Sequence, residues 1–237
     1  MEIVAVADVH SPKYLKDYEK ALRNSKLSNV GLMFFVGDMI YKGKWFEFKN
    51  VINITRRFFK GKIIACFGNE EYDNIIPLLI KNFSDIIWLN DEAVTLDYNG
   101  KKLFIVGTKG VLDRPTTWQR THIPQIYSIY SNRLERIGKL IREGKRRGYL
   151  VILLTHYPPT YKTLIGEPKY AWAEMGSEKA EEIIKENKPD IVIHGHAHNS
   201  KKTFIQLNST RIYNVALPAV HKITKIPLEY GLLRFFS

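Results

Sequence analysis

Short apolar segments recur along the chain, and five of them end directly before polar residues that can bind a metal. These segments cover residues 2–7, 32–36, 62–67, 150–154 and 191–193. Continuous apolar runs rich in Val and Ile are typical of buried β-strands, and open α/β sheets carry their chemistry at the carboxyl ends of such strands. The pattern therefore predicts functional side chains gathered along one edge of a sheet.

Amphipathic segments and a second group of strands lie between these runs. Helices are expected at 14–25, 44–59, 71–82, 133–147 and 177–187, the third interrupted at Pro77 and the last capped by Ser177, with Pro189 just past its end. Further strands are expected at 86–89, 94–98, 102–107, 202–206, 211–215 and 231–236, with Asn99-Gly100 as a hairpin turn. Strands alternating with helices predict an α/β fold with a second sheet in the later part of the chain.

The polar residues after the five runs form one mixed set of oxygen and nitrogen ligands. They are Asp8, His10, Asp38, Asn69, His156, His196 and His198. Such a set suits Mn, Fe, Zn, Ni or Co better than Ca or Mg. Seven ligands exceed what one tetrahedral zinc takes, but two cations that share a bridging carboxylate could each receive four. Because paired divalent cations hold both oxygens of a phosphoryl displacement, the set predicts a dinuclear hydrolytic site.

The motifs that contain these residues resemble those of the calcineurin-like metallophosphoesterase superfamily. The matching motifs are Asp8-Val9-His10, Gly37-Asp38, Gly68-Asn69-Glu70, His156 in a Thr-His-Tyr-Pro-Pro sequence, and Gly195-His196-Ala197-His198. Each is weak alone, since Gly-Asp and Gly-Asn are ordinary turn sequences, but their order agrees with the family from residue 8 to residue 198.

The resemblance implies two packed β-sheets flanked by helices, a four-layer α/β/β/α sandwich. It also implies two divalent metal ions, with manganese as the first choice and iron, zinc, nickel or cobalt as alternatives. Asp8, His10 and His198 would hold one metal, and Asn69, His156 and His196 the other, with Asp38 as the bridge. The attacking group would be hydroxide on the metals, so no catalytic nucleophile from the protein is implied.

Glu70 departs from the family pattern, in which the residue after Asn is a His that contacts the phosphate and helps to protonate the leaving group. General acid catalysis is typically worth about 10² to 10⁴ in rate. A carboxylate beside two dications is held in its charged form and is a poor proton donor. We interpret Glu70 as favouring the positive end of a helix that begins near residue 70. The loss of the acid favours phosphodiesters over unactivated alkyl monoesters.

The remaining His and Cys residues are assigned no chemistry. His194 is expected to point away from its neighbours as a hydrogen-bonded core residue, and His122 and His221 are expected to be structural or surface residues. Cys66 lies in an apolar strand, so we expect an inert core thiol, and as the only cysteine it allows no intrachain disulfide.

Two insertions without clear periodicity, 107–130 and 157–176, are the best candidates for substrate recognition. The first carries Arg114, Trp118, Arg120, Tyr127 and Tyr130, and the second carries Tyr161, Lys162, Lys169, Tyr170 and Trp172. Aromatic rings could stack on a base and cations could meet phosphate. The alternative is that these side chains form the small core of a lid or a dimer contact.

Length, composition and charge fit a compact enzyme. We expect one domain over residues 1–237, with no membrane span, no removable signal peptide, and a cytoplasmic location. Lys plus Arg minus Asp plus Glu, 36 minus 24, gives a net charge of +12. This balance supports anionic phosphoester substrates, but it does not establish nucleic acid as a partner, and it leaves the oligomeric state open.

The favoured function is a dinuclear metal-dependent phosphodiesterase that hydrolyses a small or nucleotide-like phosphoester. A phosphomonoesterase of the protein phosphatase kind and a nuclease are catalytic alternatives. The third alternative is a non-catalytic interaction module like the retromer subunit that shares this fold. Such modules lose metal ligands, whereas every ligand position is filled here.

Overall fold

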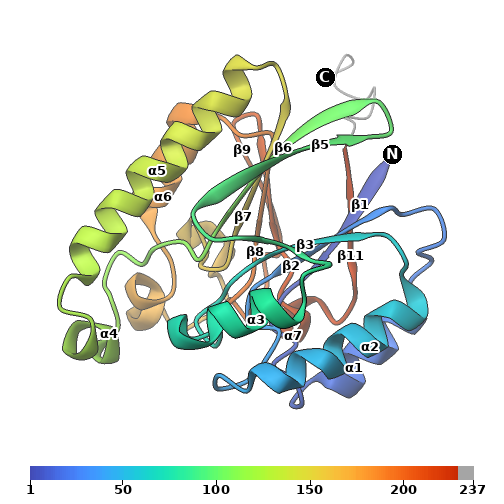
Figure 1. The fold of residues 1–237 in the computed structure, drawn as a ribbon. Helices are drawn as coiled ribbons and strands as arrows, with labels where there is room; N and C mark the ends of the chain where they lie inside the picture. Colours follow the sequence, from blue (N-terminus) through green and yellow to red (C-terminus); the bar gives the residue numbers. More distant parts are fainter. Residues whose placement is uncertain (229–237) are drawn as a thin grey trace.

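Two β-sheets pack face to face between outer layers of helices in the computed structural model, which describes residues 1–228 (Figure 1). The first sheet has the strand order β11-β1-β2-β3-β4, and the second has the order β5-β6-β7-β8-β10-β9. The strands are β1 (Glu2–Val6), β2 (Leu32–Val36), β3 (Lys62–Cys66), β4 (Ile87–Leu89), β5 (Glu92–Tyr98), β6 (Lys101–Thr108), β7 (Leu150–Thr155), β8 (Ile191–His194), β9 (Phe204–Leu207), β10 (Thr210–Asn214) and β11 (Thr224–Pro227).

The helices connect the parallel strands and cover the outer faces of both sheets. The α-helices are α1 (Leu15–Arg23), α2 (Phe48–Phe58), α3 (Ile76–Asn82), α4 (Thr117–His122), α5 (Ile126–Arg146), α6 (Glu178–Asn187) and α7 (Leu217–Val220). The 3-10 helices are η1 (Trp45–Glu47), η2 (Asp73–Ile75), η3 (Tyr161–Thr163) and η4 (Lys169–Glu174).

The central strands of each sheet are parallel, so within each sheet their carboxyl ends lie at the same edge. Strands β1 to β4 run parallel in the first sheet, as do β6, β7, β8 and β10 in the second. The edge strands β11, β5 and β9 are antiparallel. The carboxyl ends of β1, β2, β3, β7 and β8 therefore lead into loops at the same edge of the sandwich (Figure 1).

Three apolar layers explain why the strands read as continuous apolar runs. Alternate residues of β2 point to opposite faces: Phe34 enters the core between the sheets, and Phe35 packs under the helices α1 to α3. On the far side, Val151 of β7 packs against α5 and α6, while Ile152 faces the inner core. Because both faces of the sheets are buried, the predicted four-layer α/β/β/α sandwich is confirmed.

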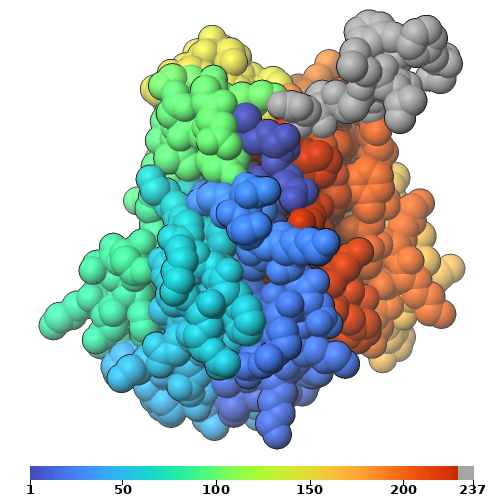
Figure 2. All heavy atoms as spheres, turned by 90° about the vertical axis from the view of Figure 1, so that its right-hand side faces the viewer, coloured from blue at the N-terminus to red at the C-terminus, as the bar shows by residue number. Residues whose placement is uncertain are grey.

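Strand β11 is an element that the sequence analysis missed. Residues Thr224–Pro227 pair antiparallel with β1, with Ile226 opposite Ile3. The space-filling view shows the red spheres of this late segment beside the blue spheres of the N-terminal part (Figure 2). The strand expected at 231–236 lies outside the described residues. A four-residue strand with two charged or polar positions offers little periodic signal.

Several helix boundaries differ from the predictions. The first insertion is not irregular, because α4 forms within it behind a Thr116–Gln119 capping box and α5 begins at Ile126 rather than at residue 133. Pro77 does not interrupt a helix, because it lies in the first turn of α3, where a missing N–H is harmless. The predicted Ser177 cap is confirmed: its hydroxyl accepts the Ala180 N–H at 3.1 Å.

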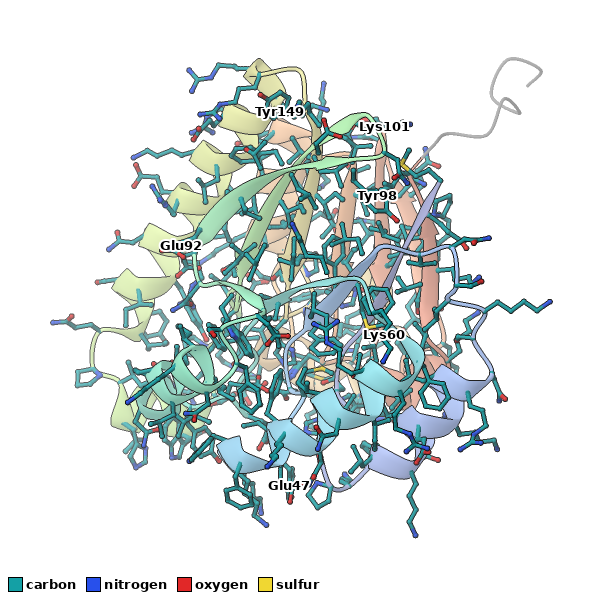
Figure 3. The ribbon with its side chains drawn as sticks, turned by 45° about the vertical axis from the view of Figure 1, so that its right-hand side comes forward. Glu47, Lys60, Glu92, Tyr98, Lys101 and Tyr149 are labelled. Carbon is teal, nitrogen blue, oxygen red and sulfur yellow. The ribbon has the colours of Figure 1, made fainter. Side chains whose placement is uncertain are left out.

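Tyr98 joins the two sheets at the end of the sandwich opposite the loops that follow β1, β2, β3, β7 and β8 (Figure 3). Its hydroxyl donates to the Glu2 carbonyl oxygen at 3.1 Å and accepts the Gly31 N–H at 3.0 Å. The adjacent hairpin turn has positive φ at Asn99 and Gly100, 51° and 81°, as the predicted Asn-Gly turn requires. The hairpin is thus anchored away from the candidate site, and Glu47 marks the other end of the molecule in the same view.

Candidate metal centre

The structure brings the seven predicted ligands together from loops at the carboxyl ends of five strands. The ligand atoms of Asp8, His10 and His198 all lie within 4.8 Å of one another. The same holds for those of Asp38, His156 and His196. The resemblance implies the first of these sets, and for the second it implies Asn69 with His156 and His196 and a shared Asp38; Asn69 Oδ1 lies 3.1 Å from Nε2 of His156. The loops that carry them come from both sheets, so the site lies where the sheets meet.

The first cluster is built around the buried carboxylate of Asp8. Its Oδ1 atom lies 2.9 Å from Nε2 of His198 and 3.5 Å from Nε2 of His10. Its Oδ2 atom accepts the backbone N–H of His196 at 2.8 Å, which ties the loop after β1 to the loop after β8. The Nε2 atoms of His10 and His198 are 3.4 Å apart, so three ligand atoms converge on one small volume.

The second cluster is built around Asp38 and His156. The Nε2 atom of His156 lies 3.4 Å from Asp38 Oδ2 and 3.1 Å from Asn69 Oδ1. Its Nδ1 atom lies 3.1 Å from the Val36 carbonyl oxygen, an acceptor that favours a proton on Nδ1, so Nε2 is the nitrogen that faces the cluster. Asp38 Oδ2 is also 3.8 Å from His10 Nε2, so Asp38 stands between the two clusters.

Backbone strain is concentrated in the loops that aim these ligands. Asp8, His10, Asp38 and His196 all have positive φ, at 61°, 43°, 52° and 67°, which L-residues rarely adopt. Such conformations each cost on the order of 1–3 kcal/mol and persist only where the surroundings enforce them. Here backbone bonds enforce them: Asp8 N–H donates to the Gly37 oxygen at 3.1 Å, and His10 N–H donates to the Asp38 oxygen at 2.9 Å.

Glu71 holds the backbone of the site loops, and the sequence analysis gave it no role. Its buried carboxylate accepts backbone N–H groups from Asp38 and Met39 at 2.8 Å, Gly68 at 2.7 Å and Ile40 at 3.3 Å. One side chain thereby fixes the loops after β2 and β3 relative to each other. Burial, and after it the nearby Asp38 charge, raise the pKa of Glu71 to about 7. The signal available in the sequence was the Glu pair directly after Gly-Asn.

The electrostatics of the clusters favour charged carboxylates. Burial opposes ionisation of Asp8, but hydrogen bonds from His10 and His198 outweigh burial and hold the pKa of Asp8 well below its usual value. Burial likewise opposes ionisation of Asp38, yet the adjacent His156 lowers the pKa of Asp38. For His156 burial disfavours the charged ring, but the Asp38 carboxylate raises the pKa of His156 to about 9. Positive charge is thus strongly favoured between these groups.

The sequence of the chain matches the calcineurin-like phosphoesterase family over residues 1–200. The chain belongs to this family. No curated protein is significantly similar to it in sequence.

Solved structures share the fold of this calcineurin-like phosphoesterase at low sequence identity. The phosphopantetheinyl hydrolase PptH of Mycobacterium tuberculosis is 12% identical over 96% of each chain, with a TM-score of 0.67. A dimetal phosphatase of Danio rerio is 10% identical over 90% of this chain and 86% of its own, with a TM-score of 0.62. Protein TT1561 of Thermus thermophilus is 14% identical over 96% and 99%, with a TM-score of 0.58. At these identities the likeness concerns the fold alone.

The donor set of this calcineurin-like phosphoesterase fits two divalent cations. Within residues 1–228 neither Asp8 nor Asp38 has a Lys or Arg partner, although both are buried. Buried carboxylates without a cation are costly. Moreover, the Nε2 lone pair of His156 meets two oxygen acceptors, an arrangement that only a proton or a cation can relieve. The residues therefore fit the metals that the family typically binds.

Glu70 lies beside the clusters, and its interpretation as a helix-opening residue is wrong. The first helical turn after it begins at Asp73, whereas Glu70 itself is non-helical. One of its carboxylate oxygens accepts the Lys42 N–H at 2.5 Å, and its own N–H donates to Asp38 Oδ1 at 2.8 Å. A ligand oxygen of Glu70 lies within 4.8 Å of ligand atoms of both His10 and Asp38.

The remaining His and Cys residues lie outside the clusters, as predicted. His194 is fully buried and its Nδ1 lies 2.9 Å from the Gly195 oxygen. His122 and His221 are exposed, the former stacked on Trp118 with ring centroids 4.7 Å apart. Cys66 is buried, and burial raises the pKa of its thiol, which keeps it unreactive.

The two insertions pack against each other and reach the site through Tyr157. The ring of Tyr157 packs edge-on against His196 at 5.0 Å, and its hydroxyl accepts a hydrogen bond from Gln119 of α4 at 3.2 Å. Arg114 N–H donates to the Ala173 oxygen at 2.8 Å, which joins the first insertion to the second. The insertions are therefore ordered neighbours of the second cluster.

The insertion side chains divide between structural and exposed positions. Tyr130 is buried, Tyr161 donates to Asp113 at 2.7 Å, Trp172 donates to the Glu167 oxygen at 3.0 Å, and Lys162 pairs with Glu181. These contacts hold the insertion side chains against each other and against α6. Trp118 and Tyr170, by contrast, are 61% and 82% exposed and remain available to a ligand.

Two tyrosines near the first cluster were also missed by the sequence analysis. The rings of Tyr14 and Tyr41 lie 6.1 and 6.0 Å from that of His10. The ammonium of Lys13 lies 4.7 Å from the Tyr14 ring centroid, and that of Lys42 lies 5.1 Å from the Tyr41 ring centroid. The rim beside His10 thus combines aromatic faces with positive charge, although no short motif marks these residues in the sequence.

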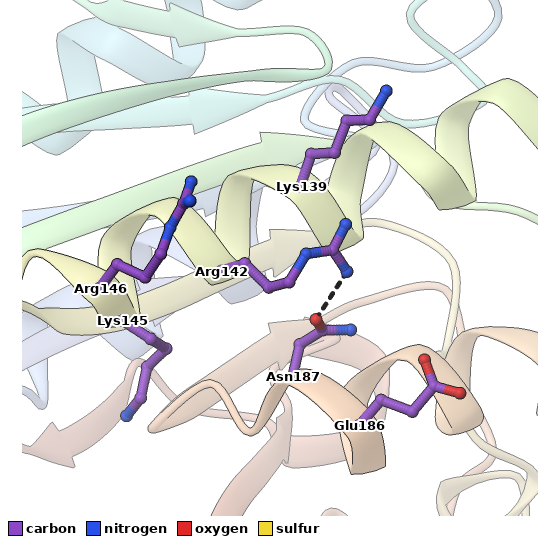
Figure 4. Close-up of a pocket in the computed structure, with 6 residues that line it drawn as sticks. All are labelled: Lys139, Arg142, Lys145, Arg146, Glu186 and Asn187. Atoms are coloured by element: carbon purple, nitrogen blue, oxygen red, sulfur yellow. Dashed lines mark hydrogen bonds between the residues drawn. The ribbon is translucent and has the colours of Figure 1, made fainter.

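A groove lined mainly by cations lies at the other end of the sandwich, between α5 and α6 (Figure 4). It has a volume of about 460 Å³ and is lined by Lys139, Arg142, Lys145, Arg146, Glu186 and Asn187. Since α5 and α6 end just before β7 and β8 begin, the groove borders the amino ends of these strands, whereas the clusters lie at their carboxyl ends. Arg142 donates to the Asn187 side chain at 2.9 Å across the groove.

Proposed function

We propose that the protein is a dinuclear metal-dependent phosphodiesterase that hydrolyses a small or nucleotide-like phosphoester. The observation that carries the proposal is the pair of adjacent ligand clusters with Asp38 between them. Membership of the calcineurin-like phosphoesterase family and the fold shared with a dimetal phosphatase support it.

The chain's own residues would hold the two cations in the arrangement that the motifs imply. Asp8, His10 and His198 would hold one cation, and Asn69, His156 and His196 would hold the other, with Asp38 shared. When bound, the two cations would polarise the phosphoryl oxygens and activate a water molecule as the nucleophile. Manganese is the first candidate for both positions, and iron, zinc, nickel and cobalt suit the same donors.

The protein contributes positioning in this proposal. Glu71 locks the loops of Asp38 and Asn69, and the Val36 oxygen fixes the ring of His156 through Nδ1. These contacts hold the donors in place before any substrate arrives, which is the condition for stabilising the charge of a transition state.

The preference for diesters follows from Glu70. In place of the family's His the chain has a carboxylate close to both His10 and Asp38, and this carboxylate is a poor proton donor beside cations. A leaving group that needs little protonation is therefore favoured. A phosphomonoesterase is the second candidate, and it is supported by the fold shared with the Danio rerio dimetal phosphatase.

The insertions 107–130 and 157–176 are proposed to form the recognition side of the site. Trp118 and Tyr170 present exposed rings, and Gln119 links α4 to Tyr157 beside His196. A nucleotide-like ligand could stack its base on such rings while its phosphate meets the clusters. The nuclease alternative would extend this contact to a longer strand.

Hydrolysis assays with the metal-reconstituted protein test the proposal. Bis-(p-nitrophenyl) phosphate, p-nitrophenyl phosphate, cyclic nucleotides, dinucleotides and single-stranded nucleic acid would each be assayed with Mn, Ni, Zn and Mg. We expect metal-dependent turnover of the diesters. Turnover of the monoester alone would instead support the phosphomonoesterase, and two bound metals without turnover of any substrate would support the non-catalytic module.

Two expectations about the protein's setting remain predictions. Within residues 1–228 no helix is both long and apolar enough for a membrane crossing. A cytoplasmic location and a single domain over 1–237 stay as the sequence predicts them.

A further inference from the structure

We infer that Glu70 is an additional metal ligand, which completes the coordination of the cation faced by His10 and Asp38. This inference rests on the proposed function, since it requires the two-cation site. It assigns to a carboxylate the place where the family has a histidine.

The position of Glu70 is the first argument. One of its carboxylate oxygens, a nitrogen of His10 and an oxygen of Asp38 all lie within 4.8 Å of one another. With bonds of about 2.0–2.2 Å, two ligand atoms of one cation lie at most about 4.4 Å apart, so three atoms within 4.8 Å of one another need to move little to share a cation. Glu70 is half-buried, whereas His10 and Asp38 are buried.

The second argument is that Glu70 is held in place without using all of its carboxylate. Its N–H donates to Asp38 Oδ1 at 2.8 Å, and its carbonyl oxygen accepts the Gly43 N–H at 3.0 Å. The Lys42 N–H occupies Oε2 at 2.5 Å. Among the described residues Oε1 accepts no hydrogen bond, so the carboxylate that reaches the cluster keeps acceptor capacity for a cation.

Charge is the third argument. Within residues 1–228 no Lys or Arg side chain forms an ion pair with Glu70, although the Asp38 carboxylate is a close neighbour. Two carboxylates that approach each other without a cation repel, and a divalent cation between them reverses the sign of the interaction. The same carboxylate removes one positive charge from the loaded site, which weakens the attraction for a dianionic monoester more than for a monoanionic diester.

A purely structural role for Glu70 makes a different prediction. In that case its task is to accept the Lys42 N–H and so to hold the loop at residues 41–43. A glutamine would keep this acceptor but would lose the charge and most of the affinity for a divalent cation. The substitution Glu70→Gln therefore separates the two roles.

Calorimetric titration of the metal-free protein with Mn²⁺ tests the inference without relying on activity. We expect the wild type to bind two ions, and Glu70→Gln to bind one as before and the other at least about tenfold more weakly. The matched control is Asp73→Asn, which neutralises an exposed carboxylate three positions away that pairs with Lys109 outside the clusters. Its two affinities should equal those of the wild type.

The outcomes separate this inference from the proposed function. Two wild-type affinities in Glu70→Gln would overturn the role of Glu70 and leave the dinuclear site intact. A wild type that binds fewer than two ions would overturn both. If Glu70→Gln does not fold, wild-type crystals soaked in Mn²⁺ decide: the Glu70 carboxylate in contact with an anomalous manganese peak supports the inference, and a carboxylate turned away from it overturns the inference.

Discussion

The two ends of the sandwich carry charge in opposite ways. At the carboxyl ends of the strands, Asp8 and Asp38 are buried among imidazoles, and within residues 1–228 they have no Lys or Arg partner. At the amino ends, the α5–α6 groove exposes Lys and Arg side chains, and two of them, Lys139 and Lys145, pair with the acids Glu135 and Asp190. Buried carboxylates without a Lys or Arg partner indicate function more strongly than exposed, paired charges do.

Backbone conformation sharpens the same contrast. Asp8, His10, Asp38 and His196 have positive φ in the site loops, whereas α5 runs as an uninterrupted helix past the groove. The lysines and arginines at the end of α5 also complement the negative end of its dipole, which explains them without a ligand. The net charge of +12 is therefore a poor guide to where this protein works.

The largest expected effect is the loss of activity in Asp38→Asn. This change removes the charge of the carboxylate shared by both clusters, and several kcal/mol of transition-state stabilisation would go with it, a loss of at least about 10³-fold in kcat. Turnover of bis-(p-nitrophenyl) phosphate and metal content by mass spectrometry would measure it. The control is Asp97→Asn in the hairpin turn at the other end. Equal rates in both variants would show that Asp38 is no more important for activity than a carboxylate at the other end of the sandwich.

Glu71→Gln should have the next largest effect, and it should appear first as lost stability. A glutamine offers one acceptor oxygen to four N–H groups and turns its NH₂ group toward donors, which should lower the free energy of unfolding by about 3 kcal/mol. Urea denaturation of the metal-free protein measures this. The exposed Glu92→Gln should change it by less than about 0.5 kcal/mol. A similar small change for Glu71→Gln would show that the amide network is dispensable.

Glu70→His should change substrate preference more than overall rate. Restoring the family's imidazole supplies a proton donor, so the ratio of monoesterase to diesterase activity should rise by about tenfold or more. Parallel assays with p-nitrophenyl phosphate and its bis ester measure the ratio. Because p-nitrophenolate leaves easily, an alkyl phosphate should show a larger gain. An unchanged ratio for both monoesters would remove the argument for diesters.

The sequence predicted the sandwich, and it predicted which side chains gather at one edge of it, because both have local signals. Apolar runs mark strands that are buried on both faces. Each candidate ligand follows such a run within a few residues, as His156 follows β7. The Ser177 cap and the Asn99-Gly100 turn are likewise decided by the residue types themselves.

What the sequence could not predict depends on contacts between distant segments. Glu71 looks like an ordinary surface acid, and only the fold brings the amides of Asp38 and Gly68 onto its carboxylate. Tyr41 reaches His10 across two loops, and β11 forms because β1 offers an open edge rather than because Thr224–Pro227 is strongly β-forming. The helical reading of Glu70 was wrong because its oxygen meets Lys42 N–H instead of a helix end.

The smallest expected effects distinguish the insertion rim, which carries the exposed ring of Trp118, from the α5–α6 groove. Trp118→Ala should raise KM for a dinucleotide about fivefold or more if the exposed ring stacks on a base. The combined change Lys139→Gln, Arg142→Gln and Arg146→Gln should leave kcat/KM for the same substrate within about twofold, because the groove borders the opposite ends of the strands.

Salt dependence completes this comparison. If the protein is a nuclease whose groove binds a long strand, the groove variant should reduce the steepness with which affinity for single-stranded DNA falls as salt rises, because fewer counterions are displaced. An unchanged slope, together with a KM effect confined to Trp118→Ala, would assign recognition to the insertion rim. Unchanged KM in Trp118→Ala for every phosphoester would instead favour a lid or dimer contact, because the exposed ring would then make no contact with the substrate.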